Sequence, residues 1–192
     1  MSEPRLILAS ASPQRRATLE RLGVPFAVQP SGVPELEEGD PAVVAVENAL
    51  RKARAVHAEG EGTPVLGVDT VVALDGALYG KPADELQARA TLKVLGGATH
   101  TVFSGVALLS SKAHPPERTA LAATEVAFRV LGDGLIDWYV STGEWRGRAG
   151  GYAIQGAGAA LVREVRGDYE NVVGLPLAAL LDLCPWLLES DG

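Results

Sequence analysis

The hydrophobic and polar positions of the chain follow two different periods, which together predict strands and helices. Short apolar runs bounded by Gly, Pro or polar turns are typical of buried strands. Apolar residues three or four positions apart are typical of helices that bury one face. Strands are therefore expected at 6–9, 26–28, 65–74, 77–79, 99–109, 119–130 and 161–165, although 120–123 would also suit a helix. Helices are expected at 13–22, 41–53, 85–95, 134–141 and 176–188.

End signals and apolar spacing add boundaries and faces to these helices. Ser12 followed by Pro13 is a strong helix start, and Gly23 is typical of the residue just past a helix end. In the helix from 41, the apolar residues at helical spacing are Val43, Val46, Leu50 and Ala53. In the helix from 85, the expected buried face is Leu86, Ala90 and Val94.

Composition and charge narrow the class of protein. Hydrophobic residues make up 47% of the 192 residues and charged residues 21%, an ordinary globular balance that fits a single domain over 1–192. The net charge of −7 argues against nucleic acid or an anionic membrane as main partner. One cysteine excludes an internal disulfide and a cysteine-based zinc site. With neither a signal-peptide pattern nor a membrane-length apolar run, a cytoplasmic location is expected.

One acidic residue stands out in the most apolar stretch of the chain, 65–74. Asp69 is the only charged residue there, and a buried carboxylate is costly unless a cation, hydrogen bonds or cleft solvent compensate it. Two interpretations are open at this point. Asp69 is either a structural residue tied to backbone amides, or a metal ligand or general base in a cleft.

Cations occur at three places that could receive an anion. Arg15 lies in the first turn of a helix that follows a strand, where Ser10, Ser12 and free amides add hydrogen-bond donors. This setting favours phosphate binding. Lys81 stands between a glycine and a proline, so its direction is defined and it could reach a phosphate. Lys52, judged from composition alone, is more typical of a solvated helix face.

Two glycine-containing stretches fail as nucleotide-binding motifs. At Gly80-Lys81-Pro82 the glycine spacing is wrong, and a proline stands where a P-loop needs Ser or Thr. Gly156 and Gly158 lack the third glycine and the acidic partner of a dinucleotide fingerprint. The Gly-rich segment 143–158 is expected to be a long loop, either functional or disordered.

Five short motifs resemble those of the Maf family of nucleotide pyrophosphatases. Ser10–Arg16 is similar to the family's Ser-x-Ser-Pro-Arg-Arg signature. The other four motifs are Gly67–Val72, Gly80–Pro82, Ala149–Gly156 and Asn171–Pro176. Each is moderately specific, but all five occur in the family's order and at its separations across essentially the whole chain.

The resemblance implies a fold, an activity and a cofactor. The implied fold is α/β, with an elongated, mixed, twisted sheet flanked by helices and two lobes around a central cleft, similar to the inosine-triphosphate pyrophosphatases. The implied activity is hydrolysis of nucleoside triphosphates to the monophosphate and pyrophosphate, by water attack on the α-phosphorus. A divalent cation, Mg²⁺ or Mn²⁺, is implied as cofactor. Members of the family are often dimers, so a homodimer is also among the expectations.

The resemblance also implies roles for residues matched by position. Asp69 matches the catalytic acid that accepts the proton, and Glu35 joins it as a metal ligand. Arg15, Lys52 and Lys81 match basic positions that hold the triphosphate, to which the hydroxyls of the first motif add donors. This set would explain why an acidic protein concentrates cations at a few points.

Three further positions track base choice in the family, and here they are Gln14, Thr70 and Gln155. Enzymes acting on dTTP and UTP usually carry Arg, Thr and Gln there, and enzymes acting on 7-methyl-GTP carry Trp, Gln and Glu. Two of the three residues support the dTTP/UTP class, and Gln14 matches neither. The Gln155 amide can both donate to and accept from a uracil or thymine edge. Arg148 replaces a lysine that is common before the Ala-Gly pair, which keeps the charge but alters its geometry.

The expected function is therefore pyrophosphate release from dTTP and UTP, with two alternatives open. One is a 7-methyl-GTP pyrophosphatase of the same family. The other is a non-enzymatic, nucleotide-binding regulator of septum formation, the effect from which the family takes its name. A haloacid-dehalogenase phosphatase is excluded because Asp69-Thr70-Val71 lacks the second aspartate of that motif.

Overall fold

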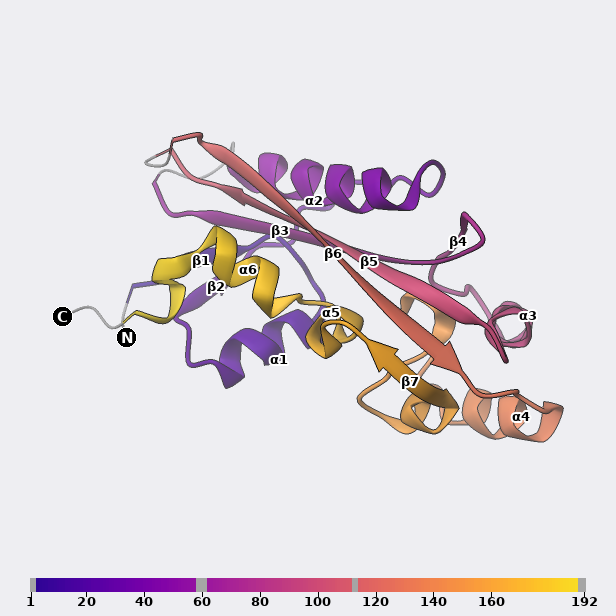
Figure 1. Cartoon of the computed structure of the whole chain (residues 1–192). Coiled ribbons are helices and arrows are strands. Elements are labelled where there is room, and N and C mark those ends of the chain that lie inside the picture. The colour runs from indigo at the N-terminus through magenta and orange to yellow at the C-terminus, as the bar shows by residue number, and fades with distance from the viewer. Residues whose placement is uncertain (1–2, 58–61, 112–113, 190–192) are drawn as a thin grey trace.

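The computed structural model describes residues 3–57, 62–111 and 114–189, which build one seven-stranded sheet with helices on both faces (Figure 1). The strands are β1 (Leu6–Leu8), β2 (Phe26–Val28), β3 (Val65–Leu74), β4 (Ala77–Tyr79), β5 (Thr99–Leu109), β6 (Glu117–Phe128) and β7 (Val162–Arg166). The α-helices are α1 (Pro13–Arg21), α2 (Pro41–His57), α3 (Glu85–Leu95), α4 (Asp133–Ser141), α5 (Tyr169–Val173) and α6 (Leu177–Leu183). The described 3-10 helices are η1 (Ala149–Gly151), η2 (Ala157–Leu161) and η3 (Pro185–Leu188).

The strand order leaves a notch in the sheet beside β3. The order is β2-β1-β3-β5-β6-β7, and β4 pairs with β3 off this path. β1 is parallel to both of its neighbours, and the other pairs are antiparallel. On one side of β3, β1 pairs with residues 65–66 and β4 with residues 72–74. In the described part of the chain, Gly67–Val71 therefore have no strand partner on that side, and we call this stretch the notch.

Two hydrophobic cores lie on one face of the sheet, on either side of the notch. On this face of β3, Val68 belongs to the first core and Val72 to the second, and on β5 Val106 and Val102 divide in the same way. Thr70 lies between them because alternate residues of a strand share a face. The first core gathers apolar residues of β1, α1 and α6, and the second those of α3 and α4 (Figure 1). The predicted α/β fold, an elongated mixed sheet flanked by helices with two lobes, is confirmed.

The opposite face is covered by α2, which packs close to the sheet because two glycines lie beneath it. A Cβ atom would stand less than 3.0 Å from the backbone oxygen of Ala49 if placed on Gly67, and of Ala45 if placed on Gly105. Asp69 points to this same face, two residues from Gly67 and directly opposite Gly105 in the ladder. The close approach of α2 brings its polar residues within hydrogen-bond distance of Asp69.

The buried faces of two helices differ from those that the apolar spacing suggested. In α2, Val43 is exposed, and the buried residues are Val44, Ala45, Asn48, Ala49, Lys52, Ala53 and Val56. In α3, Leu86 and Val94 are exposed, and the buried residues are Ala88, Leu92 and Leu95. Each helix carries a second set of small or apolar residues at helical spacing, and packing against the rest of the protein decides which of the two sets is buried. In α2 the alanine-rich stripe is buried because only small residues fit above the glycines.

Some elements are displaced or divided relative to the prediction. The segment 143–158 contains η1 and the start of η2, which continues to Leu161 and delays β7 to Val162. The predicted helix 176–188 is two helices, since Pro185 cannot continue α6 and instead begins η3. Residues 120–123 are strand. The five-residue helix α5 was not predicted, because so short a helix shows no apolar period. Among the residues described, we find no helix that combines the length and apolar character needed to cross a membrane.

Candidate active site

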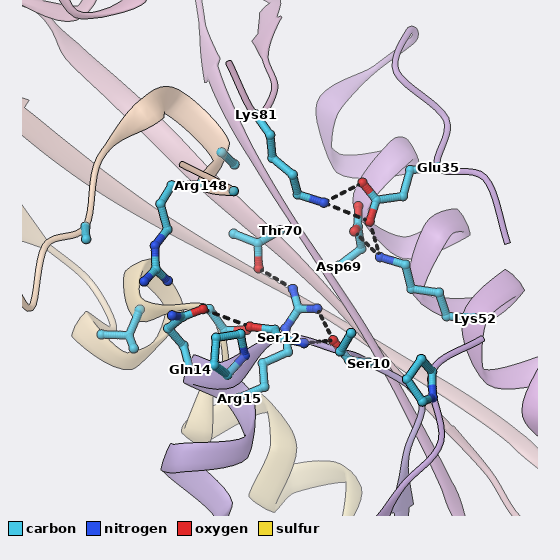
Figure 2. Close-up of a pocket in the computed structure, with 18 of the residues that line it drawn as sticks. Ser10, Ser12, Gln14, Arg15, Glu35, Lys52, Asp69, Thr70, Lys81 and Arg148 are labelled. Atoms are coloured by element: carbon cyan, nitrogen blue, oxygen red, sulfur yellow. Dashed lines mark hydrogen bonds and ion pairs between the residues drawn. The ribbon is translucent and has the colours of Figure 1, made fainter. Parts of the chain in front are cut away.

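A cleft of about 500 Å³ opens between the two lobes, beside the notch (Figure 2). Its walls come from segments far apart in the sequence: the β1–α1 turn, the loop after β2, the Gly-rich segment and the end of α5. The cleft brings together every site residue that the sequence predicted: Ser10, Ser12, Gln14, Arg15, Glu35, Lys52, Asp69, Thr70, Lys81 and Gln155. Residues from six separate regions of the chain therefore converge on one cavity.

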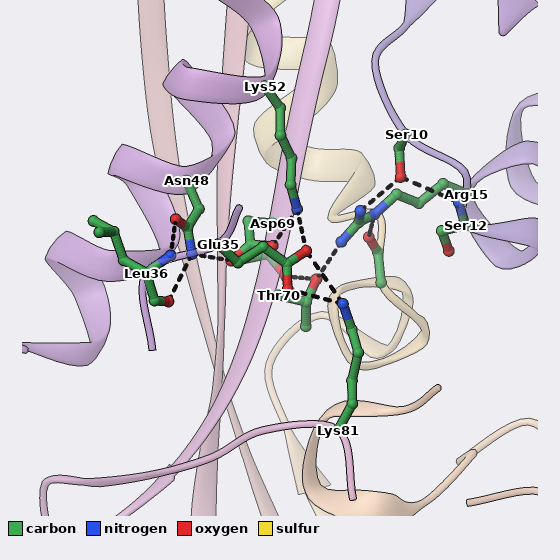
Figure 3. A network of polar contacts seen from close by, with 12 residues as sticks. Ser10, Ser12, Arg15, Glu35, Leu36, Asn48, Lys52, Asp69, Thr70 and Lys81 are labelled. Atoms are coloured by element: carbon green, nitrogen blue, oxygen red, sulfur yellow. Dashed lines mark hydrogen bonds and ion pairs between the residues drawn. The ribbon is translucent and has the colours of Figure 1, made fainter. Parts of the chain in front are cut away.

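Two carboxylates and two lysines meet on one side of the cleft, and we call Glu35, Lys52, Asp69 and Lys81 the acid–lysine cluster (Figure 3). Nζ of Lys52 donates to Oδ1 of Asp69 and to Oε1 of Glu35, each at 2.6 Å. Nζ of Lys81 donates to Oε2 of Glu35 at 2.9 Å and to Oε1 at 3.2 Å. Lys52 and Asp69 are 7% and 4% exposed, whereas Lys81 reaches in from the surface. Composition alone suggested a solvated lysine at position 52. In the structure Lys52 is instead the counter-ion of a buried acid.

The two carboxylates of the acid–lysine cluster are held by side-chain donors. Burial alone would raise the pKa of Glu35, but the hydrogen bonds and charges of Lys52 and Lys81 outweigh it and hold the pKa at about 2. Asp69 accepts from the side chains of Lys52 and Asn48 rather than from backbone amides in the described residues. The interpretation of Asp69 as an acid tied to backbone amides is therefore wrong.

Arg15 joins three parts of the cleft wall. Its Nε donates to the carbonyl oxygen of Gly174 at 2.9 Å, Nη1 to Oγ of Ser10 at 2.9 Å, and Nη2 to Oγ1 of Thr70 at 3.1 Å. Burial lowers the pKa of Arg15, and the carboxylates of the acid–lysine cluster oppose that effect. A guanidinium has five N–H groups, so these contacts leave two of them for a ligand.

The other side of the cleft offers hydrogen-bond donors from Gln14 and Arg148. The hydroxyl of Ser12 donates to Oε1 of Gln14 at 3.1 Å and does not cap α1, so the NH₂ group of Gln14 is the part left for a ligand. Arg148 extends from the facing wall toward Gln14 (Figure 2). Its buried Nε has no hydrogen-bond partner in the described residues, and burial lowers its pKa. Gln155 lines the cleft too and is exposed.

The acid–lysine cluster fits a divalent cation in its donor set. One ammonium group, that of Lys52, contacts both Glu35 and Asp69, so the two carboxylates lie close enough to share one cation. No group of three or more His, Cys, Asp or Glu side chains converges within 3–57, 62–111 and 114–189. Mg²⁺ commonly binds through one or two carboxylates together with substrate phosphates and water. Two carboxylates are therefore a sufficient protein contribution.

Two polar residues of the site were missed at the level of sequence. Asn48 contacts Asp69 from α2, and Ser104 lies 2.8 Å from the Thr70 hydroxyl, oxygen to oxygen, on the other face of the sheet. Both are buried polar residues among apolar neighbours, in a helix and a strand respectively. The same reasoning that singled out Asp69 could have found them, because a buried polar group needs a partner.

The fold and the cleft together define the class of protein. Cations and N–H donors line a cavity that ends at two carboxylates, an arrangement typical of an enzyme that hydrolyses a phosphorylated substrate. The chain belongs to the Maf family, since the family's sequence model, described as Maf-like protein, matches residues 5–185.

Curated relatives support the same membership. The chain is 47% identical to the dTTP/UTP pyrophosphatase of Deinococcus radiodurans, over 94% of this chain and 91% of the relative. It is 49% identical to the dTTP/UTP pyrophosphatase of Anaeromyxobacter dehalogenans strain 2CP-C, over 91% and 90%. It is 43% identical to that of Pyrococcus furiosus, over 93% of both chains.

Similar solved structures include two Ham1 proteins. The protein from Coxiella burnetii has a TM-score of 0.43 and 18% identity, covering 67% of this chain and 73% of that chain. The protein from Staphylococcus aureus has a TM-score of 0.44 and 16% identity, covering 66% and 71%. Because these TM-scores are below 0.5, the α/β fold class is assigned from the sheet and helices of this chain alone.

Proposed function

We propose that this protein hydrolyses dTTP and UTP to the nucleoside monophosphate and pyrophosphate. The observation that carries the proposal is the polarity of the cleft. Its two carboxylates and two lysines gather on one side, and the N–H donors of Gln14 and Arg148 lie on the other. The names of the relatives, dTTP/UTP pyrophosphatase, support the same substrate class.

The substrate would lie along the cleft, between the side with the acid–lysine cluster and the side with Gln14 and Arg148. Arg15, Lys52 and Lys81 would hold the triphosphate, and Ser10 and Ser12 would add donors beside it. The base would then face Gln14 and Gln155, whose amides can meet the carbonyl and N–H groups of uracil or thymine. The hydroxyl of Thr70 already contacts Arg15, so we assign Thr70 an effect on base choice through the placement of Arg15.

The chemistry falls to Asp69. Water attacks the α-phosphorus, its oxygen bonds to that phosphorus, the bond to the bridging oxygen of the β-phosphate breaks, and Asp69 takes the proton. Lys52 neutralises the Asp69 carboxylate before attack, and Lys81 stabilises charge on the departing pyrophosphate. When bound, Mg²⁺ or Mn²⁺ held by Glu35 and Asp69 would supply further neutralisation of that charge.

A panel of nucleotides tests the proposal. The protein is incubated with dTTP, UTP, dCTP, dITP and 7-methyl-GTP with Mg²⁺ or Mn²⁺, and pyrophosphate and orthophosphate are measured separately. We expect pyrophosphate release with the highest kcat/KM for dTTP and UTP. A higher kcat/KM for 7-methyl-GTP would overturn the base assignment and favour the alternative pyrophosphatase. Nucleotide binding without turnover would favour the regulator of septum formation.

Besides the roles of the site residues and the metal, four expectations from the sequence stay predictions. They are the single domain over 1–192, the homodimer, the cytoplasmic location, and the exclusion of nucleic acid as a partner. Light scattering on the purified protein tests the oligomeric state. Metal dependence is tested by removing metal with a chelator and restoring Mg²⁺ or Mn²⁺, which should abolish and then recover pyrophosphate release.

A further inference from the structure

One buried side chain at the site, that of Asn48, makes three hydrogen bonds and is not used by the mechanism above. Asn48 lies on α2, is 2% exposed, and has both ends of its amide engaged (Figure 3). Its Oδ1 accepts the N–H of Leu36 at 2.7 Å. Its Nδ2 donates to the carbonyl oxygen of Leu36 and to Oδ2 of Asp69, both at 3.0 Å.

These bonds give a second connection, besides that of Lys52, between two parts of the site. Asp69 is fixed in a central strand, whereas Glu35 stands in a segment between β2 and α2 that forms neither helix nor strand. The Leu36 side chain is 40% exposed, so it anchors this segment only partly. The paired bonds from Asn48 to the Leu36 backbone replace the ladder that a strand would have provided.

We infer that Asn48 is a positioning residue that sets the placement of Glu35 relative to Asp69, an inference that rests on the proposed function. An amide NH₂ group can only donate, so Asn48 fixes Oδ2 of Asp69 as an acceptor and leaves Oδ1 to Lys52. Asn48 thus acts with Lys52 on the orientation of the Asp69 carboxylate. Of these two residues, Asn48 alone bonds to the backbone of the Glu35 segment, at Leu36. Such supporting contacts hold the groups that perform the chemistry.

Neither aspartate nor alanine at position 48 can make all three hydrogen bonds of Asn48. Aspartate keeps an acceptor for the Leu36 N–H but replaces the donor with a charge that repels Asp69. Alanine removes all three bonds and leaves the Leu36 backbone without its partner. Asn48→Asp and Asn48→Ala therefore separate the two functions of the amide.

The experiment combines kinetics with hydrogen exchange. In Asn48→Ala we expect the Leu36 amide to exchange faster, and kcat for dTTP to fall about 10- to 100-fold while KM changes little, because Arg15, Lys52 and Lys81 remain. In Asn48→Asp we expect a similar loss of kcat with the Leu36 amide still protected. If Asn48→Ala does not fold, Asn48→Asp alone carries the test through its kcat.

A second buried asparagine provides a matched control. Asn171 is fully buried, and its Nδ2 donates to the carbonyl oxygen of Val102 and to Oγ1 of Thr124. Asn171→Ala should destabilise the protein to a comparable degree without accelerating exchange at Leu36.

Three results would overturn the inference: unchanged Leu36 exchange in Asn48→Ala, a kcat within about twofold of wild type in either Asn48 variant, or an equal kcat loss in an equally destabilised Asn171→Ala. Failure of the wild-type protein on every nucleotide is a separate result. It would refute the proposed function, while exchange at Leu36 would still test the positioning of its segment by Asn48.

Discussion

Asp69 and Gly105 stand directly opposite each other in the β3–β5 ladder, and the missing side chain of Gly105 is what lets α2 bring Lys52 to Asp69. We therefore predict that Gly105→Ala forces α2 away from the sheet, since the added Cβ would meet the backbone of Ala45. Overpacking of this kind costs about 1–3 kcal/mol. Urea unfolding should show this loss, and activity should fall with it. Gly134→Ala is the control, because a Cβ there meets nothing within 4 Å and stability should be retained.

Asp69→Asn tests the chemistry while preserving shape. The amide cannot take a proton from water, so kcat should fall by roughly 10²–10⁴. Circular dichroism should remain close to wild type, since the substitution adds no volume, but the melting temperature should fall, because the new NH₂ group faces a donor of either Lys52 or Asn48. Near-normal turnover in this variant would remove Asp69 from the mechanism.

Lys52 and Lys81 should respond differently to the same substitution. Lys52→Met leaves the buried Asp69 carboxylate without its cation, which costs about 3–5 kcal/mol for a buried pair. Lys81→Met removes a lysine whose side chain is 51% exposed and should change the unfolding free energy by less than about 1 kcal/mol. Chemical denaturation of both variants measures the contrast. Equal effects on stability would contradict the assignment of Lys52 as the internal counter-ion.

Arg148→Gln should weaken nucleotide binding more than turnover. The guanidinium lines the cleft with a buried, unpartnered Nε in the described structure, so we expect KM for dTTP to rise with a smaller change in kcat. Arg146→Gln is the matched control. Arg146 is two residues away, stacks on Trp145, and does not line the cleft. Steady-state kinetics of the two variants would show whether the effect belongs to the cleft, and indistinguishable KM values would argue against it.

His100 gives the protein a predictable sensitivity to acid. Burial lowers the pKa of His100 from 6.5 to about 4, so between these values the unfolded chain binds a proton that the folded chain does not. The corresponding stability is present above pH 6.5 and is lost as the pH falls to 4, by about 3 kcal/mol. In His100→Gln, which retains a partner for the Tyr152 hydroxyl, the unfolding free energy should depend less on pH over this window. His114→Gln, at an exposed site, should keep the wild-type dependence.

The sequence predicted the strands and the acid at the centre of the site because those signals are local. An apolar run of ten residues with one carboxylate predicts a buried strand, and it also predicts that the buried carboxylate has a cation or hydrogen-bond donors as partners. Asp69 was therefore singled out without knowledge of its partners. Glu35 was identified only through the family resemblance, because an exposed acid in an irregular segment has no local signal.

The errors arose where packing decides between two local solutions. In α2, a stripe of valines and leucine competed with a stripe of alanines. The glycines that select the alanines lie in β3 and β5, far away in the sequence. Composition alone predicts a solvated Lys52 for the same reason, since the burial of Lys52 follows from the face that α2 turns to the sheet. Asn48 belongs to that face as well, and its partners are 12 and 21 residues away.

The notch has a mechanical consequence for how the protein meets its substrate. The long strands β3, β5 and β6 continue from one lobe into the other (Figure 1). Helix α2 lies along these strands and packs against Gly67 and Gly105 in direct contact with the sheet. The lobes thus share these strands and α2, and a change in the width of the cleft would require the shared sheet to twist. We therefore expect the cleft to change little in width when a nucleotide binds. Discrimination between bases would then depend on the fit of the ligand to largely pre-formed walls.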